Sequence, residues 1–255
     1  MVAPDADGLS ASALDITDHD AEARCFDVFR PTHVIHLAAL QVPFCKADPI
    51  LGARVNVVGT VVLMEEMANR LPHGTFAYAS SVAAYGENDD GDESNTAGPT
   101  GKPGTLYGVY KRANEDSATV YFRDRGLQSV GLRPYVVYGV GRDQGVTSTP
   151  TAAMRAAAAG EAFHISFGGR AMYHHAHDAA RAFIAAARCR PATAAVMNRP
   201  GDEASTGDVI DAIRARVPDA AITFDDIQLP FPEAVDASEF ERVVGRLDRY
   251  SLVDG

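Results

Sequence analysis

The stretch Tyr107-Gly-Val-Tyr-Lys111 decides how this sequence of 255 residues is interpreted. Tyr107 and Lys111 are four residues apart, so on a helix they share a face and can reach one reactant together. A phenol titrates near pH ~10, and it needs a nearby positive charge to exchange a proton at neutral pH. With nine tyrosines and three lysines in the chain, chance produces this spacing in roughly one sequence of ten. The spacing suggests a catalytic pair, and the motifs that precede it in the sequence strengthen this interpretation.

The charge and the cysteines limit the classes of function. Acidic residues outnumber basic ones by 34 to 23, which gives a net charge of −11. This charge argues against a nucleic acid or an anionic membrane as a partner, because both recruit basic patches. No apolar run approaches membrane-spanning length, and the three cysteines form no C-x-x-C pair. We therefore expect a cytoplasmic protein with reduced thiols, and no metal site, although three histidines lie at or just before His177.

Strands and helices alternate along the first half of the chain. Apolar runs predict strands at 34–37, 75–79 and 129–133, the first of them buried on both faces. Helical spacing predicts helices at 18–29, 48–70 and 106–124, the last with Leu106, Tyr110 and 117–120 facing inward and Gly126 as its stop. This alternation predicts an α/β fold with a doubly wound parallel sheet.

The character of the sequence changes after Gly141. Helices are predicted near 150–159, 176–187 and 206–217, with a short strand at 163–167. We expect a dinucleotide-binding part over residues 1–141 and a smaller substrate-side lobe over 142–255.

An ordered series of motifs surrounds the Tyr107 stretch. The motifs are, in order, Asp15-Ile-Thr17, His36-x-Ala-Ala39, Asn56-x-x-Gly-Thr60, Ser80-Ser-x-x-x-Tyr-Gly86, Tyr107-x-x-x-Lys111 and Arg133-Pro-x-x-Val-Tyr-Gly139. Taken together, the series resembles the extended short-chain dehydrogenase/reductases, and within them the NAD-dependent epimerase/dehydratase family. The resemblance spans roughly residues 8 to 185 in consistent order.

The resemblance implies catalytic roles for three residues. Tyr107 matches the acid/base that moves a proton on a substrate hydroxyl or carbonyl, while NAD or NADP carries the hydride. Lys111 matches the lysine that lowers the pKa of the phenol and binds the nicotinamide ribose. Ser81 matches the hydroxyl that holds the substrate oxygen. The expected substrate is a small, sugar-like alcohol, and the protein is a possible homodimer.

The resemblance also implies a set of residues around the cofactor. Asp15 and Ile16 would meet the adenine, and Asn56 would brace the strand ends near the nicotinamide. His36 is either a cofactor contact or an ordinary core histidine, so both readings stay open. The remaining residues would line the cofactor pocket through small or aromatic side chains: Ala38, Ala39, Ser80 and Tyr135.

Departures from the family pattern narrow the chemistry. Val82-Ala83 stand where dehydratases carry an Asp-Glu pair, so dehydration is not expected. Val136 replaces the asparagine that is usual in sugar-nucleotide epimerases, and Arg170 is one place out of step with their phosphate-binding arginine. These differences count against a nucleotide-diphosphate substrate.

The glycine loop of the family is a further departure. No Gly-x-Gly-x-x-Gly precedes Asp15, so we expect the first strands and the pyrophosphate-binding loop to be lacking. Two alternatives to an active enzyme follow. One is a non-catalytic fragment or pseudoenzyme that does not bind the dinucleotide, and the other is a regulatory protein that senses NAD(P) without turnover. The sequence does not choose between NAD and NADP, or between epimerase and dehydrogenase.

Overall fold

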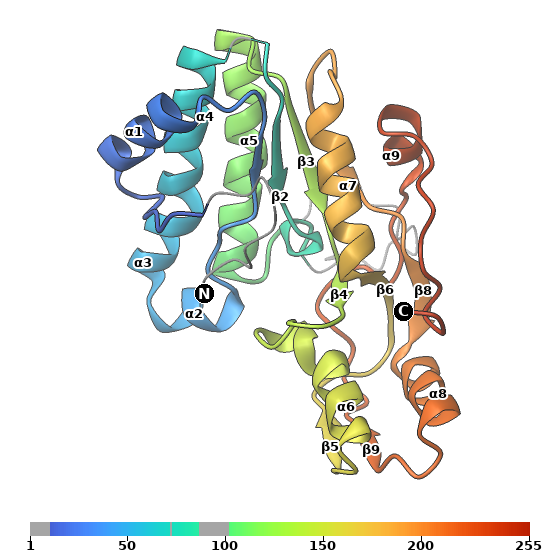
Figure 1. The fold of residues 1–255 in the computed structure, drawn as a ribbon. Coiled ribbons are helices and arrows are strands. Elements are labelled where there is room, and N and C mark those ends of the chain that lie inside the picture. The colour runs from blue at the N-terminus through green and yellow to red at the C-terminus, as the bar shows by residue number, and fades with distance from the viewer. Residues whose placement is uncertain (1–10, 72, 87–101) are drawn as a thin grey trace.

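A computed structural model describes residues 11–71, 73–86 and 102–255 of the chain. Four parallel strands form the main sheet in the order β1-β2-β3-β7 (Figure 1). They are β1 (Val34–His36), β2 (Phe76–Ala79), β3 (Ser129–Arg133) and β7 (Ala194–Asn198). The predicted α/β class with a doubly wound parallel sheet is confirmed.

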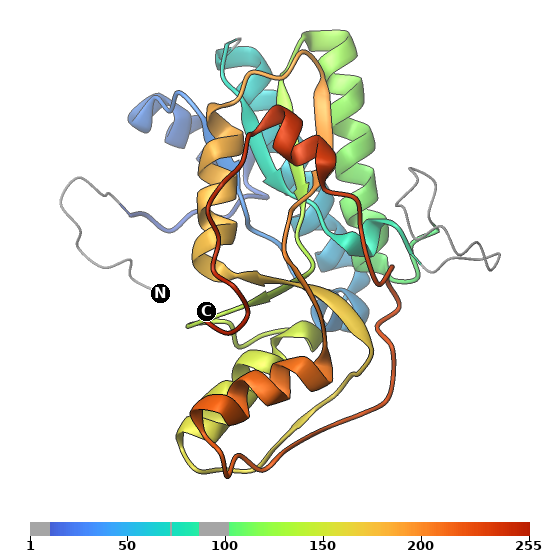
Figure 2. The same ribbon diagram turned by 90° about the vertical axis from the view of Figure 1, so that its right-hand side faces the viewer.

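Helices cover both faces of this sheet. On one face lie α1 (His19–Phe29), α4 (Gly59–Arg70) and α5 (Leu106–Arg125), and on the other lie α7 (Ala176–Arg188) and α9 (Ser238–Val243) (Figures 1 and 2). Side chains alternate along β2, so Phe76 and Tyr78 pack toward α4 and α5 while Ala77 packs toward α7. The sheet is therefore the middle layer of three.

A smaller assembly lies at the carboxyl-terminal end of the main sheet. The strands β4 (Val136–Tyr138), β6 (Arg170–His175) and β8 (Asp202–Ser205) form one sheet, in which β6 is parallel to β4 and antiparallel to β8. The strands β5 (Phe163–Ile165) and β9 (Ile222–Phe224) form a parallel pair. Two helices, α6 (Thr149–Ala158) and α8 (Thr206–Arg216), pack in the same part of the molecule around one apolar cluster (Figure 2).

The main sheet and the smaller assembly each contain elements from both sides of residue 141, the predicted boundary. Although α7 and β7 follow that residue, both belong to the main sheet and its covering layer. Conversely, β4 precedes residue 141 but pairs with β6. The two sheets are thus built from interleaved segments, because the parallel pairing of β3 with β7 brings the chain back from the smaller assembly.

Two predicted elements differ in the structure. The strand predicted at 34–37 is not buried on both faces: Ile35 and Leu37 are exposed, because β1 pairs only with β2 and lies at the edge of the sheet among the described residues. The single helix predicted at 48–70 is divided into α3 (Pro49–Ala53), the π-helical turn η1 (Arg54–Val58) and α4. A short helix, α2 (Val42–Ala47), comes before them.

The helix α5 has the predicted ends but a different buried face. Thr105 caps its first turn, accepting from the Gly108 N–H over 3.1 Å, and Gly126 ends it in the left-handed conformation. Leu106 and Val120, which were expected to face inward, are exposed. The buried face is largely polar, because α5 packs against the strand ends and the site rather than only against the apolar core. It consists of Gly108, Tyr110, Lys111, Asn114, Glu115 and Ala118.

Spanning helices and metal-ligand clusters are both absent from the described part of the chain. Within residues 11–71, 73–86 and 102–255, no helix combines the length and the apolar character needed to cross a membrane. The same residues contain no group of three or more His, Cys, Asp or Glu side chains that could hold a metal ion.

Candidate active site

A pocket of about 490 Å³ opens at the carboxyl ends of the parallel strands. Its walls include residues that directly follow β1, β2 and β3, namely Leu37, Ser80 and Pro134. α5 contributes Tyr107 and Lys111 to the same pocket. Ligand sites of open α/β sheets lie at this edge, because the strand ends diverge there into loops. The pocket is therefore the candidate active site.

Lys111 is anchored at the base of the pocket. Its side chain is only 3% exposed, and Nζ donates a hydrogen bond of 2.6 Å to the carbonyl oxygen of Ala79 at the end of β2. Nζ lies 5.5 Å from the centre of the Tyr107 ring. Burial lowers the pKa of Lys111 to about 8, against the opposing effects of Cys45 and Glu115. The predicted proximity of Tyr107 and Lys111 is thus present.

Tyr107 faces Ser81 and a second cation. Burial raises the pKa of Tyr107 to about 12, while a hydrogen bond with Ser81 and the positive charge of Arg142 act in the opposite direction. In the protein alone, burial outweighs the opposing effects of Ser81 and Arg142, and the expected lowering of the Tyr107 pKa by Lys111 stays a prediction for the cofactor-bound site. Arg142, rather than Lys111, is the cation whose charge favours the Tyr107 phenolate.

Ser81 is held by the turn that follows β2. Its Oγ accepts a hydrogen bond of 3.2 Å from the Ala83 N–H and so caps the short helix η2 (Val82–Ala84). The turn packs directly against α5: a Cβ added to Gly108 would lie 2.2 Å from the Ala83 carbonyl oxygen. Glycine at position 108 therefore permits the close approach that brings Ser81 to Tyr107.

Ser80 joins the pocket to a buried ionic network. Its Oγ donates to the Glu115 carboxylate, which also accepts two hydrogen bonds from the Arg133 guanidinium over 2.7 and 2.6 Å. Arg133 lies 4.2 Å over the ring of Tyr85, whose hydroxyl donates to Asn198 Oδ1 over 2.9 Å. The network connects the ends of β2, β3 and β7 with α5, so it fixes the backbone on which Ser80 and Ser81 lie.

His36 has the environment of an ordinary core histidine. Its Nε2 is 3.0 Å from Thr60 Oγ1, and its ring stacks on Phe76 with centroids 6.0 Å apart. Burial, and then the charge of Lys111, lower the pKa of His36 to about 4. The ring is neutral at physiological pH and does not line the pocket wall.

Asn56 holds the loop after β1 in place. Its side chain accepts from the Leu40 N–H over 2.7 Å and donates to the Leu40 carbonyl over 2.8 Å. Its own carbonyl, freed in the π-helical turn, accepts from Asn114 Nδ2 over 2.8 Å. This geometry is that of a bracing residue.

The other predicted cofactor residues divide between the pocket and the surface. Ala39 and Tyr135 line the pocket, and the Tyr135 ring packs edge-on against Phe231 at 5.9 Å. Ala38 is exposed, outside the pocket. Asp15 is also exposed, with Oδ1 accepting from the Thr17 N–H and hydroxyl, and Ile16 packs beside Gly59 of α4.

Arg142 is the functional candidate that the sequence motifs do not reveal. Its Nη2 donates to Thr147 Oγ1 over 3.3 Å, and its Nε is buried without a partner in the part of the chain that the structure describes. When the oxygen and nitrogen of the Gln41 side-chain amide are exchanged, both find hydrogen-bond partners. In that orientation Arg142 Nη1 donates to Gln41 Oε1 over 2.7 Å. In the sequence near Arg142, the only feature that could have indicated a special position is the preceding pair Gly139-x-Gly141, because both glycines have positive φ.

Comparison with known proteins yields one family model. The model described as "NAD dependent epimerase/dehydratase family" matches residues 4–197. UDP-glucuronate 4-epimerase 1 of Arabidopsis thaliana is 35% identical over 133 residues, which are 52% of this chain and 31% of that protein. An uncharacterized epimerase/dehydratase of Staphylococcus aureus (strain MRSA252) is 28% identical over 254 residues, covering 94% of this chain and 78% of that protein. The chain thus aligns with about a third of the length of the first of these relatives.

Solved structures share the fold. UDP-glucose 4-epimerase of Thermus thermophilus, in complex with NAD, matches with a TM-score of 0.76 at 25% identity, over 90% of this chain and 76% of that one. The GalE-like L-threonine dehydrogenase of Cupriavidus necator matches with a TM-score of 0.85 at 20% identity, over 99% and 86% of the two chains. Both the main sheet and the smaller assembly are therefore found in known proteins.

Proposed function

The chain belongs to the NAD dependent epimerase/dehydratase family, and from this premise we propose that it acts by hydride transfer at a hydroxyl-bearing carbon of a sugar-like substrate. The outcome would be epimerisation or dehydrogenation. The observation that carries the proposal is that Tyr107, Ser81 and the buried Lys111 line one pocket at the carboxyl ends of the strands.

Each of these residues has a role that fits its surroundings. Tyr107 gives or takes the proton of the substrate hydroxyl, and Ser81 holds the same oxygen, since both residues line the same pocket. Arg142 favours the phenolate by its charge, and Lys111 keeps a buried positive charge beside the ring. Burial keeps the Tyr107 phenol protonated at rest, so the phenol must lose this proton before it can accept one from a substrate hydroxyl, and the charge of Arg142 favours that loss.

The pocket has features that suit the nicotinamide end of NAD or NADP. That cofactor, when bound, supplies and accepts the hydride. The wall where it would be held is lined by Lys111, Ala39, Ser80 and Tyr135. Asp15 and Ile16, proposed for the adenine end, lie outside this pocket.

The substrate class follows from the charges at the pocket. Arg142 brings an incompletely bonded cation to a wall that is otherwise largely apolar. An acidic sugar, or a sugar phosphate, would pair with it. The relatives named UDP-glucuronate 4-epimerases agree with an acidic sugar. Val82 and Ala83, both buried in the turn beside Ser81, offer no acid for expelling water, so dehydration is not proposed.

The test uses the chain with NAD and two substrate probes, free glucuronate as the acidic sugar and UDP-glucuronate as its nucleotide-linked form. Epimerised sugar is followed by NMR, and NADH by its absorbance. Tyr107→Phe should lower the rate by about 10²-fold or more, because only the proton-transferring hydroxyl is lost. Tyr110→Phe is the matched control: its hydroxyl donates to the Pro49 carbonyl over 2.9 Å, away from the pocket. Tyr107→Phe retaining more than about a tenth of the wild-type rate would contradict the assignment.

A protein that binds the dinucleotide without turnover is the second candidate. The raised pKa of Tyr107 favours it, since a phenol that stays protonated cannot accept a proton. Calorimetric titration with NAD separates the two proposals. Binding without exchange of substrate hydrogen, over a panel of acidic and neutral sugars, would support the second candidate.

A further inference from the structure

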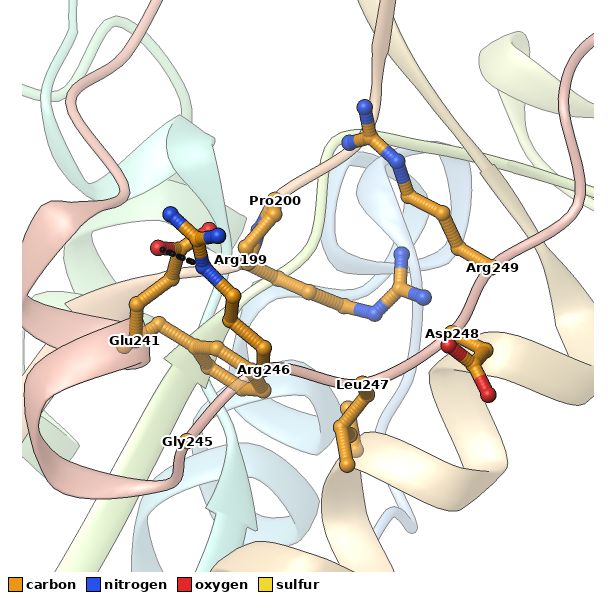
Figure 3. A pocket seen from close by; sticks show the side chains of 10 residues that line it. Arg199, Pro200, Glu241, Gly245, Arg246, Leu247, Asp248 and Arg249 are labelled. Carbon is orange, nitrogen blue, oxygen red and sulfur yellow. Dashed lines mark hydrogen bonds and ion pairs between the residues drawn. The ribbon is translucent and has the colours of Figure 1, made fainter.

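A second pocket, of about 320 Å³, lies beside the carboxyl end of β7. Arg199 and Pro200, which follow β7, form one side, and the segment from Gly245 to Arg249 forms the other (Figure 3). No residue lines both this pocket and the candidate active site. Ala182 of α7 faces this pocket, whereas Ala179 and Phe183 of the same helix face the active site, so different faces of α7 serve the two.

Arg199 is a buried cation with an unused donor. It is 5% exposed, and its Nη1 lies 2.6 Å from His174 Nδ1. Its Nε is buried without a partner among the described residues. Burial lowers the pKa of Arg199 to about 10, with Asp178 opposing and Arg249 adding to the effect. A buried donor with no acceptor is costly, so the site favours an acceptor that enters from outside.

Two further arginines stand around the same space. Figure 3 shows the Arg199 side chain crossing the pocket toward the segment that carries Asp248 and Arg249, and Arg246 on the other side. Arg199 and Arg249 repel each other, as the effect of Arg249 on the Arg199 pKa shows. An anion between them would convert this repulsion into two attractions.

No carboxylate forms an ion pair with Arg199 among the described residues. Glu241 pairs with Arg246 over 3.1 Å, and Asp202 pairs with Arg249 over 3.4 Å. Asp178 accepts from the Tyr250 N–H over 2.8 Å through Oδ2. The carboxylate of Asp248 points away from the Arg199 guanidinium in Figure 3. Asp178 therefore acts on Arg199 through its charge alone, and the Arg199 Nε stays unsatisfied within the described part of the chain.

The wall of the pocket is fixed by backbone contacts. Arg249 Nη1 donates to the Gly201 carbonyl over 2.7 Å, and Arg181 Nη1 donates to the Asp248 carbonyl over 3.1 Å. These bonds tie the segment to β7 and to α7. The arginines are thus presented on a surface that is held in place before a ligand arrives, which lowers the cost of binding.

We propose that this pocket binds a small oxyanion of the phosphate class, with Arg199 as the buried donor and Arg249 and Arg246 at the rim. The volume lies at the lower end of the ~300–1,000 Å³ range of ligand pockets, so it suits phosphate or the phosphate end of a small ester. The site is separate from the proposed active site, and its test does not depend on catalysis.

The test measures inorganic phosphate binding at constant ionic strength, with chloride as the replacing ion. Phosphate should bind saturably in a calorimetric titration and raise the midpoint of thermal unfolding, because it binds the folded chain. Arg249→Gln should weaken binding by about tenfold or more, as expected for a lost charge-assisted hydrogen bond. Arg246→Gln, at a side chain 88% exposed, leaves the fold intact and should weaken binding several-fold.

The matched control is Arg242→Gln. Arg242 is 71% exposed, pairs with Glu239 in α9 and does not line the pocket, so its loss should leave phosphate binding unchanged. A parallel titration with glucose 1-phosphate distinguishes the sources: tighter binding of the ester indicates a phosphorylated metabolite, and equal or weaker binding indicates the free ion. Absence of saturable binding, or equal affinity in all three variants and the wild type, would overturn the proposal.

Discussion

Lys111 carries an ammonium group that the fold buries away from water, which costs free energy. It is almost completely buried, and its ammonium group donates to the neutral carbonyl of Ala79. Burial of an ammonium group disfavours its charged form, which accounts for the pKa near 8. Such strain at one residue is typical of functional sites, where a charge is held for a ligand rather than for stability.

The burial of Lys111 predicts a pH dependence of stability. The folded chain releases the Lys111 proton near pH 8, whereas the unfolded chain keeps it to about pH 10.5. Between these values the unfolded state binds more protons, so the free energy of unfolding should rise with pH, by roughly 3 kcal/mol in all. Lys111→Met should lack this rise in urea unfolding measured from pH 7 to 10.5.

Lys46→Met provides the control for that measurement, because Lys46 is exposed in the last turn of α2. It should keep the same pH dependence as the wild type. Parallel stability curves for the wild type and Lys111→Met across the whole range would show that Lys111 is not a strained charge.

The residue motifs predicted part of the site. The spacing of Tyr107 and Lys111 and the motif around Ser81 were sufficient to assign three residues to one site, and all three line the same pocket. Arg142 was not predicted, because its position depends on how the loop after Gly139 and Gly141 turns. The extent to which burial raises the Tyr107 pKa was also not predictable, because a motif specifies neighbours but does not specify burial.

At the scale of elements, the contact between α5 and the turn η2 brings the proposed catalytic residues Tyr107 and Ser81 together. α5 carries Tyr107, and the turn η2 follows Ser81, so the packing of one on the other sets their separation. The end of α5 was predicted from Gly126, but the close packing on η2 was not, because it depends on the absence of a side chain at Gly108. The π-helical turn at Asn56 was unpredicted for a similar reason, since its carbonyl is used by Asn114 of another helix.

Gly108→Ala tests this contact. Alanine favours a helix by about 1 kcal/mol over glycine, but its Cβ would lie 2.2 Å from the Ala83 carbonyl oxygen. We expect a net loss of about 1–3 kcal/mol in the free energy of unfolding, because backbone must shift to accept the methyl group. Gly207→Ala in α8 is the control: its nearest neighbour, Ser205 Oγ, is 3.4 Å away, so it should be neutral or stabilising. Equal stability of Gly108→Ala and the wild type would contradict the packing argument.

At the scale of the whole molecule, the order of strands along the chain differs from their order in space. β7 follows the smaller assembly in sequence but completes the main sheet beside β3. Periodicity predicted the helix that became α7, yet it could not place that helix on the main sheet, because the choice depends on which apolar surfaces meet. The interleaving matters for function, since α7 and the loop at Leu229–Phe231 close the pocket that α5 and the strand ends begin.

The edge of the main sheet predicts how the chain behaves in solution. β1 pairs with β2 on one side only within residues 11–71, 73–86 and 102–255, and Ile35 is 38% exposed there. An uncovered apolar edge strand is a template for pairing with another chain. The purified 255-residue chain should therefore self-associate with increasing concentration in analytical ultracentrifugation, and Ile35→Lys should weaken that association, since an edge lysine opposes strand pairing. Ile184→Lys, at an isoleucine 44% exposed on α7, should leave it unchanged. A monomer at every concentration, or equal effects of the two substitutions, would show that the β1 edge is not the surface of contact.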